Sequence, residues 1–173
     1  MSIDKEIVKD FVIESKTLIE ELLDLLESIE GDFSQVRNLA NYGNSVDRIM
    51  GGARSLAMMV PPDHALHMIS DYAALCKAVG YKASQIQDNE KFFDICVALL
   101  LDATETLNLL LNNIHESGES IRKVIPVTFL ERLRWVSSQF SEEYTMSVDT
   151  GPADQPKKLK QTEIDDLLRK LGL

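Results

Sequence analysis

The chain has 173 residues, 45% of them hydrophobic and 27% charged, with a formal net charge of −10 at pH 7. This length and composition are typical of one soluble globular domain with a short appendage, and the negative charge argues against nucleic-acid and anionic-membrane partners. We see no apolar run near the roughly 18 residues of a membrane span and no secretion signal, and we therefore expect a cytoplasmic protein that binds neither nucleic acid nor membrane.

Helices are expected throughout the first 145 residues, because apolar residues recur every three, four or seven positions and no segment alternates as a strand does. The predicted helices cover about residues 7–29, 36–60, 63–80, 88–115 and 127–144. The fourth is apolar on most sides, which predicts neighbours on two or three sides. Short connections favour an all-α fold, an antiparallel up-down helical bundle with an extra helix.

The composition changes near residue 146. Residues 146–173 hold five basic and five acidic residues, so the net charge of −10 belongs to residues 1–145. Residues 146–158 contain two prolines, one glycine and no aromatic residue, which predicts a flexible linker. The expected organisation is a helical bundle over 1–145, a linker over 146–158 and a separate C-terminal element over 159–173.

Two glycines, Gly51 and Gly52, lie inside the second predicted helix, where each costs roughly 1 kcal/mol relative to alanine. Close packing of two helices is one explanation. The segment DRIMGGA at residues 47–53 also resembles the motif His-x-x-Lys-Gly-x-Ala of histidine-phosphotransfer (Hpt) domains, with Gly51 and Ala53 at the glycine and alanine positions. The resemblance extends over about residues 5–115 and implies an Hpt-like helical bundle.

The chain departs from the Hpt motif at the residues that carry its chemistry. Asp47 stands where the phosphorylated histidine is expected, and Met50 where the lysine is expected. Phosphotransfer requires an imidazole nucleophile, so Asp47 marks a degenerate phosphotransfer position that passes no phosphate. Elsewhere, His67 and Asp71 are spaced to meet on one helix face, and we expect an ordinary contact there and no metal site.

The last 13 residues, QTEIDDLLRKLGL, predict a helix of about two turns. Ile164, Leu167, Leu168 and Leu171 form one apolar stripe at positions i, i+3, i+4 and i+7. Acidic residues occupy the first turn and basic residues the last, as the helix dipole favours, and Gly172 can close the helix. Such a helix is marginal alone in water. The spacing leaves open whether it docks on its own bundle, on a dimer mate or in a partner's groove.

This segment resembles the C-terminal peptide of the chemotaxis phosphatase CheZ, which binds the phosphorylated response regulator CheY, and a similar peptide begins the flagellar switch protein FliM. Gln161, the run 165–168 and Leu171-Gly172 follow the CheZ order. The resemblance implies a CheY-like receiver as the partner, and it implies that the receiver is bound by Ile164, Asp165, Asp166, Leu167, Leu168 and Leu171. The CheZ catalytic pattern Asp-x-x-x-Gln does not occur in the chain.

A second phosphatase family, CheC and CheX, has a different fold and uses Glu-x-x-Asn on a helix. Glu105 and Asn108 have this spacing on the polar stripe of the fourth predicted helix, and an ordinary solvated helix face is the alternative. The leading hypothesis is a chemotaxis protein that captures a phosphorylated CheY-like receiver and promotes its dephosphorylation. The alternative is an inert adaptor that only sequesters the receiver. We expect no cofactor in this chain, because the receiver would hold its own magnesium.

Overall fold

The structure, a computed structural model, describes residues 3–140 and 161–173, and every named element in these two ranges is helical. The elements are α1 (Lys5–Ile29), the 3₁₀ helix η1 (Phe33–Asn38), α2 (Leu39–Ala57), α3 (Ala65–Ala83), α4 (Glu90–Asn112), α5 (Gly118–Arg122), α6 (Val127–Gln139) and α8 (Gln161–Leu171). The predicted all-α helical bundle is confirmed. The predicted linker over 146–158 and the end of the fifth predicted helix lie outside the described residues.

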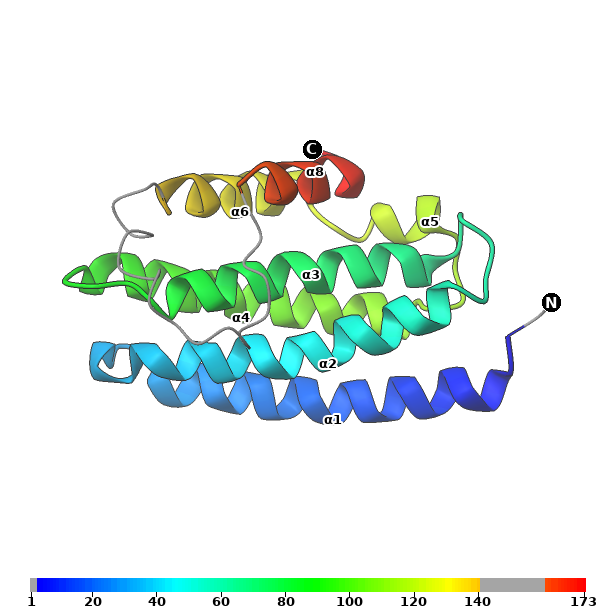
Figure 1. The fold of residues 1–173 in the computed structure, drawn as a ribbon, viewed down its shortest axis with the longest axis horizontal. Coiled ribbons are helices and arrows are strands. Elements are labelled where there is room, and N and C mark those ends of the chain that lie inside the picture. The colour runs from blue at the N-terminus through cyan, green and yellow to red at the C-terminus, as the bar shows by residue number, and fades with distance from the viewer. Residues whose placement is uncertain (1–2, 141–160) are drawn as a thin grey trace, which may run out of the picture.

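Helices α1 to α4 lie side by side and successive helices run in opposite directions (Figure 1). Helix α4 packs against α1, α3, η1 and α6, as its broad apolar surface predicted. The short α5 precedes α6, and α6 and α8 lie next to each other on the outer side of α3 (Figure 1). Helix α3 therefore has neighbours almost all round: α2, α4, α5 and α8.

Several helix boundaries differ from the predicted ones because local capping decides them. The predicted second helix is divided, since Asp32 accepts a hydrogen bond from the Ser34 amide and begins the separate η1. Helix α3 begins after His64, whose Nδ1 accepts from the Leu66 amide at 3.2 Å. The unpredicted α5 begins where the Ser117 side chain accepts from the amide three residues on, the usual N-cap geometry.

Gly80 is a contact point between helices, although its position predicted the end of the third helix. A Cβ placed on Gly80 would lie 2.6 Å from the ring of Tyr42, and a Cβ on Gly43 would lie 2.8 Å from the ring of Tyr81. Each helix thus places a glycine under a tyrosine of the other, which lets α2 and α3 approach closely. Helix α3 continues past this contact to Ala83.

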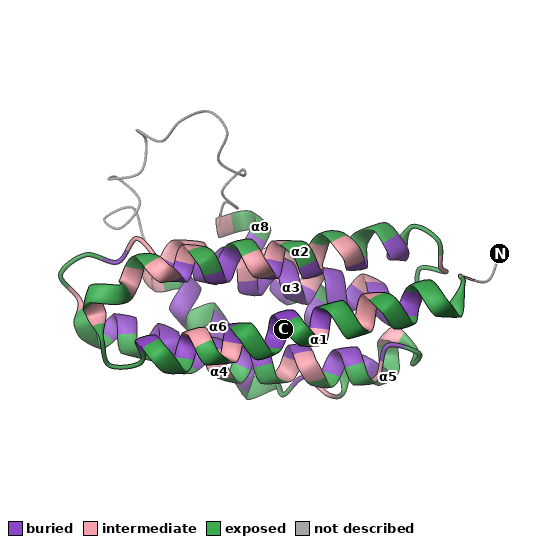
Figure 2. Cartoon of the chain, turned by 90° about the horizontal axis from the view of Figure 1, so that it is seen from below, coloured by how far each residue is buried: buried purple, intermediate pink, exposed green. Residues whose placement is uncertain are grey.

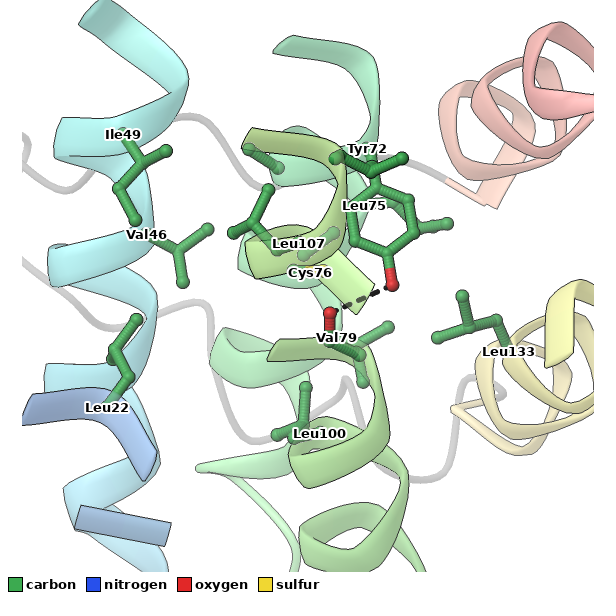
Figure 3. Packing of buried hydrophobic residues seen from close by; sticks show 14 of the residues in the cluster. Leu22, Val46, Ile49, Tyr72, Leu75, Cys76, Val79, Leu100, Leu107 and Leu133 are labelled. Atoms are coloured by element: carbon green, nitrogen blue, oxygen red, sulfur yellow. Dashed lines mark hydrogen bonds between the residues drawn. The ribbon is translucent and has the colours of Figure 1, made fainter. Parts of the chain in front are cut away.

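Two buried tyrosine hydroxyls join this pair to α4. Tyr42 Oη lies 3.0 Å from Thr104 Oγ1, and Tyr72 donates to the Ala103 carbonyl at 2.9 Å. Around them the core is apolar and continuous. The helices around α3 turn their buried sides toward it (Figure 2). In Figure 3, Tyr72 lies between the α2 side of the core and Leu133 of α6. Both hydroxyls have partners, so their burial carries no unpaired polar group.

The two adjacent glycines of α2 have different surroundings. A Cβ on Gly52 would lie 2.8 Å from the ring of Phe11 in α1, so close helix packing explains this residue. Around Gly51 there is nothing within 4 Å of such a Cβ, and packing within the chain does not explain it. The packing interpretation is therefore confirmed for Gly52 and is wrong for Gly51.

We predict opposite effects for two glycine-to-alanine substitutions. Gly51→Ala should raise the free energy of unfolding by about 0.5–1 kcal/mol, because alanine is the better helix former and its methyl meets nothing. Gly80→Ala should lower it by about 1–3 kcal/mol, because the Tyr42 ring is fully buried and cannot yield. Urea denaturation measures both, and equal effects would contradict the contact described here.

Candidate functional site

Asp47 lies in an ion pair between α2 and α3. The Lys77 ammonium donates to Asp47 Oδ1 at 2.6 Å, and the lysine side chain is 14% exposed against 43% for the aspartate. The Tyr81 ring lies beside the pair, with its centroid 6.0 Å from Lys77 Nζ. Burial raises the pKa of Tyr81, and the Asp47 charge adds to the rise. Asp47 thus forms an ion pair that joins two helices.

The surroundings of His64 and His67 are those of residues with a structural role. His64 caps α3, and burial, together with the charges of His115 and His67, lowers its pKa. The Nε2 atom of His67 is buried and has no hydrogen-bond partner within the part of the chain that the structure describes. The charge of His67 acts on Asp71, although no hydrogen bond joins the two. Among residues 3–140 and 161–173, no group of three or more metal-ligating side chains is placed to hold a metal ion.

Glu105 and Asn108 lie on the outward face of α4, and in the described part of the chain neither forms a hydrogen bond or an ion pair. Glu105 is exposed and Asn108 is half-buried. One turn before Glu105, Asp102 pairs with Arg132 of α6 at 3.0 Å. Exposed Ile95 and Leu109 share this face. The stripe is therefore mainly polar with two separate exposed aliphatic residues, as an ordinary solvated helix face also is.

The predicted receiver-binding stripe packs on the chain's own bundle. Ile164, Leu168 and Leu171 are 0%, 2% and 1% exposed, and α8 lies against α3 and α6 (Figure 1). Leu167 and Asp165 are half-buried. Asp166 is exposed and pairs with Arg169 one turn on, at 3.5 Å. The spacing left three docking positions open: the chain's own bundle, a dimer mate and a partner's groove. In the structure, α8 docks on its own bundle.

Charges place α8 antiparallel to α3. Asp165, in the first half of α8, acts on Lys82 at the end of α3, and Lys170, near the end of α8, acts on Asp71 in the first half of α3. Burial lowers the pKa of Lys82 and the Asp165 charge opposes the shift. Burial likewise raises the pKa of Asp71, and the Lys170 charge opposes it. The charges on α8 and α3 therefore favour this antiparallel arrangement.

The C-terminus of α8 is closed by two further contacts. Gly172 has a φ of 116°, a conformation that glycine adopts at little cost, and the Leu173 amide donates to the Leu168 carbonyl at 3.1 Å. Arg122, at the end of α5, donates to the Lys170 carbonyl at 3.1 Å. The sequence indicated Gly172 as the end of the helix, but it held no signal for Arg122, because α5 was not predicted.

Burial of three aliphatic side chains is the main stabilisation of docked α8. Each contributes about 1.5–3 kcal/mol before the entropy of ordering the helix is subtracted. The helix has three turns over Gln161–Leu171, one more than predicted, and the side-chain Nε2 of Gln161 donates to Asp165 Oδ1 at 3.2 Å. In this position its polar face is outermost, with Glu163, Asp166, Arg169 and Lys170 exposed.

Comparison with protein families, curated proteins and solved structures finds no match to this chain. The resemblances to Hpt domains and to the CheZ peptide therefore stay predictions. Over residues 3–140 and 161–173, no helix has the length and hydropathy that a membrane crossing requires.

We predict that the Asp47–Lys77 pair stabilises the fold more than an exposed pair does. Asp47→Ala leaves the largely buried Lys77 ammonium without its carboxylate and should lower the free energy of unfolding by about 1–2 kcal/mol. Asp102→Ala, which breaks an exposed pair, should change it by at most about 0.5 kcal/mol. Urea denaturation of both variants tests this, and equal losses would contradict the structural role of Asp47.

Proposed function

We propose that this protein is a chemotaxis-type signalling protein that captures a phosphorylated CheY-like response regulator with its C-terminal helix and promotes its dephosphorylation. The observation that carries the proposal is α8 itself. It is an amphipathic helix with a C-terminal cap and three buried aliphatic residues on one face. It follows the bundle after residues 141–160, and its residue order resembles that of the CheZ C-terminal peptide.

Capture would use a common mode of peptide recognition, in which an amphipathic helix inserts its apolar face into a groove. Ile164, Leu168 and Leu171 lie at one-turn intervals and supply that face. Two acidic residues of α8, Asp165 and Asp166, would contact basic groups at the rim of the groove.

Dephosphorylation would require only that the bundle complete the receiver's active site. The phosphoryl group sits on the receiver's aspartate, and the receiver supplies its own magnesium. A water molecule attacks the phosphorus, the bond to the aspartate oxygen breaks, and inorganic phosphate and a free carboxylate result. The Asn108 amide would orient the water, and Glu105 would contact the receiver. Tethering by α8 raises the local receiver concentration, so this second contact can be weak.

An inert adaptor is the alternative function, and the absence of the CheZ catalytic pattern Asp-x-x-x-Gln from the sequence favours it. Asp47 stands at the position that the Hpt resemblance assigns to the reactive histidine, and its charge is already paired with Lys77. A bundle without phosphotransfer chemistry can still localise a receiver. The lifetime of the receiver's aspartyl-phosphate separates the two functions, because a phosphatase shortens it whereas an adaptor leaves it unchanged or lengthens it.

We predict that a peptide of residues 159–173 binds a CheY-like receiver, and that it binds the phosphorylated form more tightly. Leu168→Ala should weaken this binding by about 1–3 kcal/mol, or about 5-fold to 150-fold, as expected for a buried aliphatic anchor. The matched control is Arg169→Ala, because this side chain is largely exposed. Calorimetric titration measures all three peptides. Equal affinities of the Leu168 and Arg169 variants contradict capture by the apolar stripe.

We also predict that two substitutions in α4 separate catalysis from capture. Asn108→Ala should return the aspartyl-phosphate lifetime to that of the receiver alone, while binding through α8 persists. Glu105→Ala should raise the protein concentration needed for half-maximal acceleration. Asn41→Ala, an exposed asparagine of α2, is the control and should have no effect. If Asn108→Ala and Glu105→Ala keep full activity, the catalytic amide lies elsewhere, and Asn112 on the same stripe is the next candidate.

A further inference from the structure

We propose that α8 is an intramolecular latch: the bundle holds the apolar stripe that the receiver needs, so that receiver capture requires α8 to leave its dock. The dock consists of the α3 face between Asp71 and Lys82, the adjoining side of α6, and Arg122 at the end of α5. This inference rests on the proposed function, because it describes the regulation of the same binding segment.

Docking and capture exclude each other because they use the same side chains. Ile164, Leu168 and Leu171 are buried against the bundle, and one face of a helix cannot pack against two proteins at once. The face of docked α8 that solvent reaches is polar, with Glu163, Asp166, Arg169 and Lys170 exposed. A receiver groove that binds an amphipathic helix requires the aliphatic face. The docked helix therefore presents nothing that such a groove can bind.

The dock carries charges opposite to those of α8 as well as buried apolar side chains. The charge of Asp165 acts on Lys82 and the charge of Lys170 acts on Asp71, which favours the antiparallel direction of α8 on α3. Leu75 and Ala78 lie on the same α3 stripe by helical spacing and are buried. Arg122 adds a hydrogen bond to the last turn. These contacts specify a defined docked state.

The contacts that hold α8 on the bundle are also few enough that contacts with a partner can replace them. The helix has 11 residues, a length that is marginal without a packing surface. Residues 141–160 join it to the bundle, and a chain of this length can span at most about 70 Å. A released α8 therefore stays near the bundle and can reach a receiver beside it. The apparent affinity for the receiver is then the intrinsic affinity multiplied by the fraction of undocked molecules.

The test weakens the dock without altering α8. In the full-length protein, Arg122→Gln together with Lys82→Gln removes one hydrogen bond and one charge contact from the dock. The matched control is Arg37→Gln with Lys91→Gln, which removes the same two charges from exposed positions of η1 and α4, outside the dock. Two quantities are measured: hydrogen exchange of the amides of residues 161–171, and affinity for a CheY-like receiver of the same genome activated with beryllium fluoride.

We expect the dock variant to exchange these amides faster and to bind the activated receiver about fivefold more tightly, while the control matches the native chain. If the native chain binds the receiver and the dock variant exchanges faster without binding more tightly, the latch is wrong and the proposed function stands. If all three proteins fail to bind the receiver, the proposed function is wrong and the latch with it. If the amides of residues 161–171 exchange at the same rate in the dock variant as in the native chain, Arg122 and Lys82 do not hold α8. This result also overturns the latch.

Discussion

The close approach of α2 and α3 is the constraint on which the rest of this structure depends. Gly43 and Gly80 each accept a tyrosine ring of the opposite helix, and a Cβ at either position would lie within 3 Å of that ring. The arrangement fixes Tyr42 so that its hydroxyl meets Thr104 of α4, and this contact sets the position of α4. The Asp47–Lys77 pair lies along the same interface and is possible only because the two helices are so near.

The central position of α3 follows from this constraint and explains the role of α8. Most of α3 is buried, and α2 and α4 together cover only part of its circumference. The side that remains carries apolar residues between Asp71 and Lys82, which must be covered by another element. Helix α8 covers it with Ile164, Leu168 and Leu171. The same apolar face thus completes the core of the bundle and is the only face of α8 suited to a partner's groove.

The two proposed activities belong to separate parts of the molecule. Glu105 and Asn108 lie on α4, whose neighbouring acidic residue Asp102 is bound to Arg132 of α6. Helix α6 in turn packs beside α8. A receiver held by released α8 would therefore have to reach past α6 to meet the α4 stripe. In this proposal, α8 supplies the binding affinity and α4 supplies the chemical step. A substitution in one of these helices can therefore change its role without changing the role of the other.

By itself, the sequence determined what depends on local periodicity and capping: the helical fold, the amphipathic stripe of α8 and the stop at Gly172. It also placed Glu105 and Asn108 on one helix face, because residues three positions apart on a helix are neighbours. Only the tertiary structure decided that Lys77 pairs with Asp47, that Gly80 receives Tyr42, and that α8 packs on α3. Each of these joins residues on different helices. Their meeting depends on how the helices pack, and helical periodicity carries no information about which of several apolar faces will meet.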